Sequence, residues 1–223
     1  RFAKLGMVAY CADYRVRSRH KTSPFEAVAD AKAAVRWIWR NAESQGVDQK
    51  RIVSAGGSAG GHLAACCGLV AGHEELRAGE PAFIPAAMVL FNPVLSFMHG
   101  GLASRVNGDE AIAAKISPLS HVKPDTPPSI VMYGTNDRLK AFGDLWWAKA
   151  KELGFRADKY TAEGGKHGFF NQSPWLERTM IAADEFLASL GYLQGEPTVK
   201  FPTGDKLKGL KVEQKRKTTN LHL

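Results

Sequence analysis

The sequence predicts an α/β fold with a mostly parallel sheet and helices on both faces. Two observations predict it. Short apolar segments rich in β-forming residues alternate with longer segments of helical periodicity, and a glycine-rich turn joins one such pair. The chain has 223 residues, of which 44% are hydrophobic and 23% charged, enough for one domain with a substantial core. No apolar run approaches the roughly 18 residues of a membrane-spanning helix, so no membrane span is predicted.

The expected elements follow in chain order. Strands are expected in short apolar segments at residues 7–12, 51–55, 86–91, 129–133 and 157–161. Helices are expected in longer periodic segments at residues 23–43, 60–70, 141–153 and 174–190. The first helix has a start signal, because Ser23, Pro24 and Glu26 provide an N-cap, a proline at the first helical position and a capping-box glutamate. Residues 94–122 break the alternation and are expected to form a partly helical insertion, or small cap.

The net charge of +8 is concentrated at the two ends of the chain. Residues 1–22 hold six basic residues and one acidic residue, and residues 196–223 hold seven basic and three acidic residues. The rest, residues 23–195, has a net charge of −1, which argues against a basic face for nucleic acid. We therefore expect no nucleic-acid partner, the alternative being DNA binding through the basic ends. Residues 195–223 are expected to be a loosely ordered tail after a domain of residues 1–194.

The segment Gly56-Gly57-Ser58-Ala59-Gly60-Gly61 contains G-x-S-x-G between an expected strand and an expected helix. On such a turn the serine adopts a strained backbone, and side chains two residues to either side would collide, which predicts glycine at 56 and 60. The Ser58 oxygen would stand at the positive end of the next helix, where the Ala59 amide could donate to an oxyanion. The alternative is a plain glycine-rich turn. A P-loop is excluded because the sequence has no G-x-x-x-x-G-K-[ST], and a dinucleotide fingerprint is excluded by the glycine spacing.

A base and an orienting acid for Ser58 follow it in the chain order Ser, Asp, His, which is the order of catalytic triads whose serine lies on such a turn. Asp137 follows the strand expected at 129–133, and His167 follows the strand expected at 157–161. Because the carboxyl ends of parallel strands meet at one edge of a sheet, the two side chains are expected near Ser58. The order Ser, Asp, His therefore predicts Ser58 as nucleophile, His167 as base and Asp137 as the acid that orients it.

These blocks resemble α/β-hydrolases of the esterase/lipase group that includes hormone-sensitive-lipase-like and acetyl-xylan-esterase-like enzymes. The resemblance covers about three quarters of the chain and rests on Asp13-Tyr14-Arg15, Asp30 to Trp37, Arg51-Ile52 with Gly57 to Gly61, Ser117-Pro118, Gly134 to Asp137 and His167-Gly168-Phe169. It implies the α/β-hydrolase fold and the same three roles for Ser58, His167 and Asp137. Many members carry aspartate at the position of Gly57, so glycine there favours the acetyl-esterase-like branch.

The resemblance also implies that part of the fold is missing from this chain. Members carry a His-Gly-Gly-Gly-type loop before the strand that corresponds to residues 7–12, and this loop supplies further oxyanion donors. Here the sequence starts after that position, and His99-Gly100-Gly101 lies downstream of the serine. We therefore expect an N-terminally truncated domain that lacks its first strands and has one unprotected sheet edge.

The expected function is that of a serine carboxylic-ester hydrolase with an acyl-enzyme intermediate. The short insertion favours short-chain, acetyl esters of small molecules or carbohydrates, with Gly57 and Phe169 as candidate substrate contacts. No cofactor and no metal are expected, and Cys11, Cys66 and Cys67 are expected to be packed free thiols. The alternatives are an oligopeptidase-like serine peptidase and a non-catalytic binding protein of hydrolase fold.

Overall fold

The computed structural model describes residues 2–98, 101–106, 108–195 and 199. Its sheet has four parallel strands in the order β1-β2-β3-β4. The strands are β1 (Val53–Gly57), β2 (Ala87–Phe91), β3 (Ser129–Gly134) and β4 (Ala157–Ala162). The helices are α1 (Arg17–His20), α2 (Pro24–Arg40), α3 (Ala59–Leu69), α4 (Glu110–Lys115), α5 (Lys140–Leu153) and α6 (Trp175–Ser189). The predicted α/β class is confirmed.

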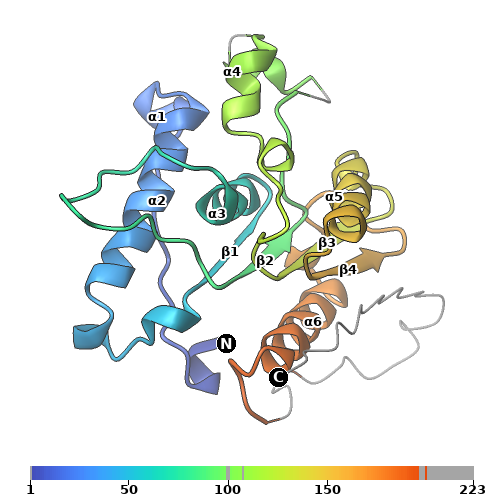
Figure 1. The fold of residues 1–223 in the computed structure, drawn as a ribbon. Helices are drawn as coiled ribbons and strands as arrows, with labels where there is room; N and C mark the ends of the chain where they lie inside the picture. Colours follow the sequence, from blue (N-terminus) through green and yellow to red (C-terminus); the bar gives the residue numbers. More distant parts are fainter. Residues whose placement is uncertain (1, 99–100, 107, 196–198, 200–223) are drawn as a thin grey trace.

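Helices cover both faces of the sheet, with α3 and α5 on one face and α6 on the other (Figure 1). Strand β2 is buried along its whole length, as central strands of parallel sheets are. Its alternate side chains enter two cores: Met88 and Leu90 pack with α3 and α5, whereas Val89 and Phe91 pack with α6. The sheet is therefore packed on both faces, and its carboxyl edge is the place where parallel sheets carry their sites.

The expected capping box starts α2. The Ser23 N–H donates to Glu26 Oε2 at 2.9 Å, and the Phe25 N–H donates to Ser23 Oγ at 3.3 Å. Strands β2 to β4 lie within one residue of their expected bounds, and β1 begins two residues later than expected. Within the described residues, no helix has the length and apolar character that a membrane crossing requires.

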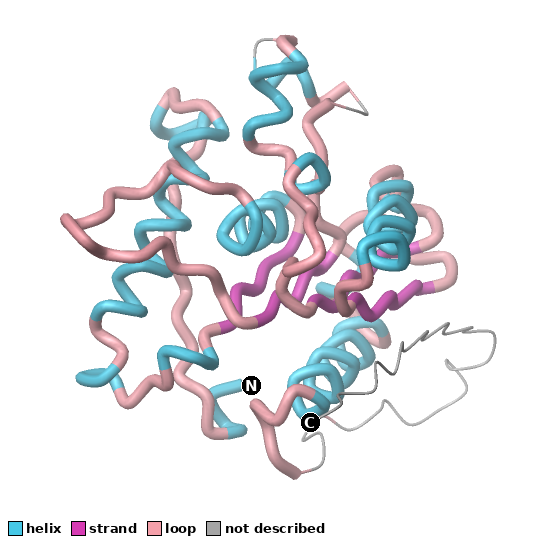
Figure 2. Tube along the Cα trace, viewed as in Figure 1, coloured by secondary structure: helices cyan, strands magenta, loops and turns pink. Residues whose placement is uncertain are grey.

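The strand expected at residues 7–12 is wrong. This segment is a loop that pairs with no described strand (Figure 2). Its residues Val8 and Tyr10 are exposed. A groove of about 370 Å³ lies between it and β1, so the N–H and C=O groups of the two backbones cannot form a ladder. Strand β1 is thus an edge of the described sheet. Cys11, expected to be buried in this strand, is exposed, whereas Cys66 and Cys67 are buried as predicted.

The insertion after β2 is partly helical, as expected, with 3-10 helices at Ala103–Val106 and Pro118–Ser120 on either side of α4. The Ser117 hydroxyl ties its two ends together, because it accepts from the Phe97 N–H at 2.8 Å and donates to the Ala113 carbonyl at 2.7 Å. The expected tail lies mostly at residues 196–198 and 200–223, outside the described residues, as do His99 and Gly100.

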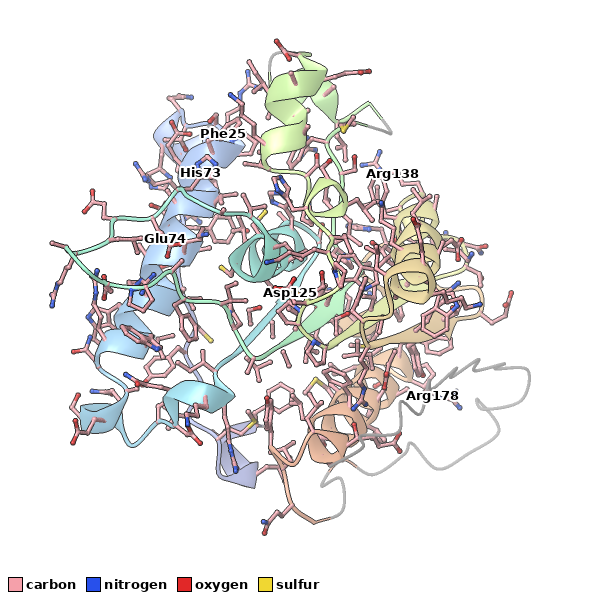
Figure 3. The ribbon with its side chains drawn as sticks, in the orientation of Figure 1. Phe25, His73, Glu74, Asp125, Arg138 and Arg178 are labelled. Carbon is pink, nitrogen blue, oxygen red and sulfur yellow. The ribbon has the colours of Figure 1, made fainter. Side chains whose placement is uncertain are left out.

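A buried ionic cluster fixes the long connection from α3 to β2 against α2. Glu74, labelled in Figure 3, lies 3.2 Å from Lys32 Nζ and 3.0 Å from Arg36 Nη2, and all three side chains are buried. Beside it, the rings of Phe25 and His73 pack at 5.6 Å. Because a buried charge is costly unless it is paired, this cluster holds the connection in one position.

Candidate active site

Ser58 lies at the turn from β1 to α3 and has a strained backbone, with φ 54° and ψ −115°. Two hydrogen bonds fix the turn. The Ser58 N–H donates to the Phe91 carbonyl at 2.9 Å, and the Ser58 carbonyl accepts from the His62 N–H at 3.0 Å. The predicted sharp strand-to-helix turn is therefore present, and it projects the Ser58 side chain from the carboxyl edge of the sheet.

Close backbone contacts explain two glycines at this turn. A Cβ on Gly56 would lie 2.3 Å from the Gly60 carbonyl oxygen, and one on Gly61 would lie 2.9 Å from Pro93. A Cβ on Gly60 would meet nothing within 4 Å. The expectation that glycine is required at 56 is confirmed, and the same expectation at 60 is wrong. The first turn of α3 directs the Gly60 Cβ position into open space. Gly61 is the helix residue that faces Pro93, in the segment after β2.

This difference gives a matched pair of variants. We expect Gly56→Ala to lower the free energy of unfolding by about 3 kcal/mol or more, because its methyl group would overlap backbone atoms. Gly60→Ala should be neutral or stabilising by up to about 1 kcal/mol, because alanine favours the helix. Urea unfolding followed by circular dichroism measures both. Equal midpoints for the two variants would contradict the geometry of the turn.

The structure brings the three predicted side chains together in one hydrogen-bonded row. Ser58 Oγ lies 2.8 Å from His167 Nε2, and His167 Nδ1 lies 2.9 Å from Asp137 Oδ2. The Asp137 side chain is fully buried, and its Oδ1 accepts from the Leu139 N–H at 2.9 Å. The His167 side chain is 39% exposed. A buried carboxylate thus holds a histidine whose other nitrogen faces the serine.

Glycines allow the loops after β3 and β4 to approach closely, so that Asp137 and His167 can form their hydrogen bond. A Cβ on Gly134, at the end of β3, would lie 2.0 Å from the Gly165 carbonyl oxygen. That same oxygen accepts from the Asn136 N–H at 2.9 Å. Because β3 and β4 are parallel neighbours, the two loops leave the same edge. Glycine at 134 therefore lets the Asp137 turn rest on the His167 loop.

Asn92 is a site residue that the sequence analysis missed. It directly follows β2, is fully buried and has a φ of 34°. Its Oδ1 accepts from the Gly168 N–H at 3.1 Å, which turns its Nδ2 toward His167 Nε2 at 3.4 Å. The signal in the sequence is its place directly after a strand, the same signal that identifies Asp137 and His167.

The remaining candidate residues lie around Ser58. The Ala59 N–H is the first of α3 and has no intrahelical acceptor, and Ala59 lines a cavity of about 270 Å³. The Phe170 ring covers Gly57, where a Cβ would lie 2.4 Å from it. Phe169 is 7% exposed and packs in the core with Phe170 and Trp175. Substrate contact by Gly57 and Phe169 stays a prediction.

His62, the other histidine near the turn, has a different environment. It is buried, its Nε2 lies 2.7 Å from the Ile116 carbonyl and 3.3 Å from Cys66 Sγ, and burial lowers its pKa to about 4. It is therefore neutral near pH 7 and links α3 to the insertion. Within the described part of the chain, no group of three or more His, Cys, Asp or Glu side chains could hold a metal ion.

Comparisons with known proteins show the family to which the chain belongs. The BD-FAE family profile matches residues 1–99. The structure superimposes on apo esterase 2 from Thermogutta terrifontis with a TM-score of 0.80 at 38% identity, covering 87% of this chain and 76% of that one. The chain belongs to the α/β-hydrolase serine esterase/lipase family. The butyrate-bound form of the same esterase matches at a TM-score of 0.77 and 37% identity, over 88% of this chain and 77% of that one.

Curated members of this family are longer. Esterase LipC of Mycobacterium tuberculosis (strain ATCC 25618 / H37Rv) is 28% identical over 61% of this chain and 38% of its own length. Esterase LipQ of the same organism is 26% identical over 82% of this chain and 47% of its own length. The chain thus spans less than half the length of these two relatives.

Proposed function

We propose that this chain carries the nucleophile, base and orienting acid of a serine carboxylic-ester hydrolase. The observation that carries the proposal is the continuous row from Ser58 Oγ through the two nitrogens of His167 to Asp137 Oδ2, with spacings of 2.8 and 2.9 Å. The esterase names of its relatives support the same activity.

The proposed mechanism follows from the hydrogen bonds. When His167 Nδ1–H donates to Asp137, the lone pair of Nε2 is free to take the Ser58 proton. The Ser58 oxygen attacks the ester carbonyl, and the Ala59 N–H stabilises the oxyanion at the start of α3. His167 then gives the proton to the leaving alcohol, and an acyl-enzyme remains on Ser58. Water activated by His167 releases the acid.

We propose short-chain acyl esters, acetyl esters included, as the substrates, with esters of carbohydrates as one class. The Phe170 ring over Gly57 and the cavity of about 270 Å³ beside Ala59 leave room for small groups around the serine. The butyrate bound to esterase 2 from Thermogutta terrifontis supports a short acyl chain. Rates with p-nitrophenyl acetate, butyrate and decanoate, and acetate release from acetylated xylan, test this order of preference.

Covalent labelling tests the mechanism. A fluorophosphonate probe should form one adduct per chain, and peptide mass spectrometry should place it on Ser58. Addition of p-nitrophenyl acetate should slow the labelling, because probe and ester compete for one oxygen. An unlabelled Ser58 in protein that hydrolyses the ester would exclude this mechanism.

The contacts of Asn92 predict that it positions His167. Its Oδ1 accepts from the Gly168 N–H at 3.1 Å and its Nδ2 lies 3.4 Å from His167 Nε2, so it holds the loop that carries the base. Asn92→Ala removes both contacts, and kcat for p-nitrophenyl acetate should fall by about tenfold or more because the base is less well placed. Asn171→Ala is the matched control, because Asn171 is exposed and its side chain donates to the Gly168 carbonyl. Equal kcat values for wild type and Asn92→Ala would show that Asn92 does not position His167.

A further inference from the structure

The cavity beside Ala59 has an apolar floor. Its lining residues come from the segment around α1, from the start of α3 and from the start of the insertion. In the view of Figure 1, α3 lies below α1. Leu63, Val94 and Phe97 line it, and so does His62, whose pKa of about 4 leaves it uncharged near pH 7. Ala59 directly follows the proposed nucleophile, so the cavity lies beside the turn that carries Ser58.

Its charged residues are all of one sign. The fifteen lining residues include Arg15, Arg17 and Arg105, and no aspartate or glutamate. Arg15 is neutralised, since its guanidinium donates to Asp30 at 2.7 to 3.0 Å. Arg17 and Arg105 form no ion pair with any described acidic residue, so their positive charge is uncompensated. They come from opposite sides, Arg17 from α1 and Arg105 from the insertion.

Glu26 of α2 is a negative charge near the cavity, and it is already paired. Its carboxylate accepts from the Ser23 hydroxyl and the Ser23 N–H in the capping box, the hydroxyl being the larger cause of its lowered pKa, and it does not line the cavity. Thr22 also lines the cavity, and its hydroxyl oxygen is buried without a hydrogen-bond partner among the described residues. Two free guanidinium groups and an unsatisfied hydroxyl favour an anionic oxygen ligand over a neutral one.

We propose that this cavity selects esters that carry a carboxylate on the acyl or the alcohol part, with Arg17 and Arg105 binding the carboxylate while the ester carbonyl lies at Ser58. This inference rests on the proposed function and adds a substrate class to it. The apolar floor would hold the carbon chain between the two charges. A short span suffices, because the cavity holds only about 270 Å³.

Matched ester pairs test the proposal on both sides of the bond. The acyl pair is mono-(4-nitrophenyl) adipate against 4-nitrophenyl hexanoate, and the alcohol pair is 4-acetoxybenzoate against 4-acetoxybenzamide. Each kcat/KM is divided by the rate of hydroxide hydrolysis of the same ester. We expect at least one carboxylate to be preferred by about tenfold at low salt, as for a charged hydrogen bond, with the preference falling at 0.5 M NaCl.

Substitutions of the two arginines test whether they bind the carboxylate. Arg17→Gln and Arg105→Gln should each reduce the preference about threefold, and the double variant should abolish it. Arg19→Gln is the matched control, because Arg19 is an exposed arginine of α1 outside the cavity lining. Hydrolysis of both esters of each pair without preference, or a preference that survives the double variant, would overturn the proposal and leave the proposed function intact.

A binding measurement separates the carboxylate-binding proposal from the proposed esterase function. NMR titration compares 4-hydroxybenzoate with 4-hydroxybenzamide on wild type and on the double variant. If no ester is hydrolysed but the carboxylate binds more tightly and loses this advantage in the double variant, the cavity proposal stands and the proposed function fails. Equal binding of the two ligands in that case overturns both.

Discussion

Ser58→Ala is expected to lower kcat for p-nitrophenyl acetate by about 10⁵ to 10⁶, the loss typical when the nucleophile of such a row is removed. Ser58 Oγ is the atom that faces His167 Nε2 at 2.8 Å, and alanine leaves no oxygen to attack the carbonyl. The Ala59 N–H and the cavity remain, so a small residual rate over water is expected. Steady-state kinetics with protein purified on a fresh column measures the loss.

Ser44→Ala is the control for this variant. Ser44 is exposed, its hydroxyl donates to the Asn41 carbonyl, and it lies on the connection between α2 and β1. Its kcat should equal that of wild type. Far-ultraviolet circular dichroism should be unchanged for both variants. Hydrolysis by Ser58→Ala within tenfold of the wild-type rate would show that another group attacks the ester.

Asp137→Asn is expected to lower kcat by about 10⁴, because it sets the wrong tautomer of His167. The Leu139 N–H donates to one oxygen of Asp137, at 2.9 Å, so an amide at this position would turn its oxygen to Leu139 and its NH₂ group to His167 Nδ1. His167 would then keep its proton on Nε2, where it cannot accept the one from Ser58. KM should change little, since Asp137 is buried behind the histidine.

Asp144→Asn is the matched control for the acid. Asp144 is an exposed carboxylate of α5 that pairs with Lys140 at 2.7 Å and also with Lys159. Its loss should leave kcat unchanged and cost at most about 1 kcal/mol of stability, as for other exposed ion pairs. Comparable kcat values for Asp137→Asn and Asp144→Asn would mean that the histidine needs no orienting carboxylate in this chain.

The sequence predicted the parts of the fold whose signals are local. Strands β2 to β4 and the helices between them carry their own periodicity, and the capping box of α2 lies within four residues. The segment at residues 7–12 has a similar apolar composition, yet it is not a strand, because a strand also needs a neighbour for its backbone hydrogen bonds. Composition cannot state whether that neighbour is present.

The candidate site also has parts that the sequence predicted and parts that it did not. The turn at Ser58 and the order of Asp137 and His167 could be found in the sequence, because strand ends of a parallel sheet meet at one edge. The need for glycine at 61 and not at 60 depends on Pro93, which the sequence places more than thirty residues away. The role of position 60 was therefore predicted wrongly from the motif alone.

By itself, then, the sequence determined the α/β class, the strained turn at Ser58 and the two residues, His167 and Asp137, that lie in a row with it. Tertiary structure alone decided that β1 is an edge of the described sheet, that Asn92 contacts His167 and that Arg17 faces the same cavity as Arg105. The basic start of the chain, which composition showed only as excess charge, contributes one of these arginines. The physical reason is that a turn is set by neighbouring residues, whereas a pocket's charge is set by side chains that meet only after the chain has folded.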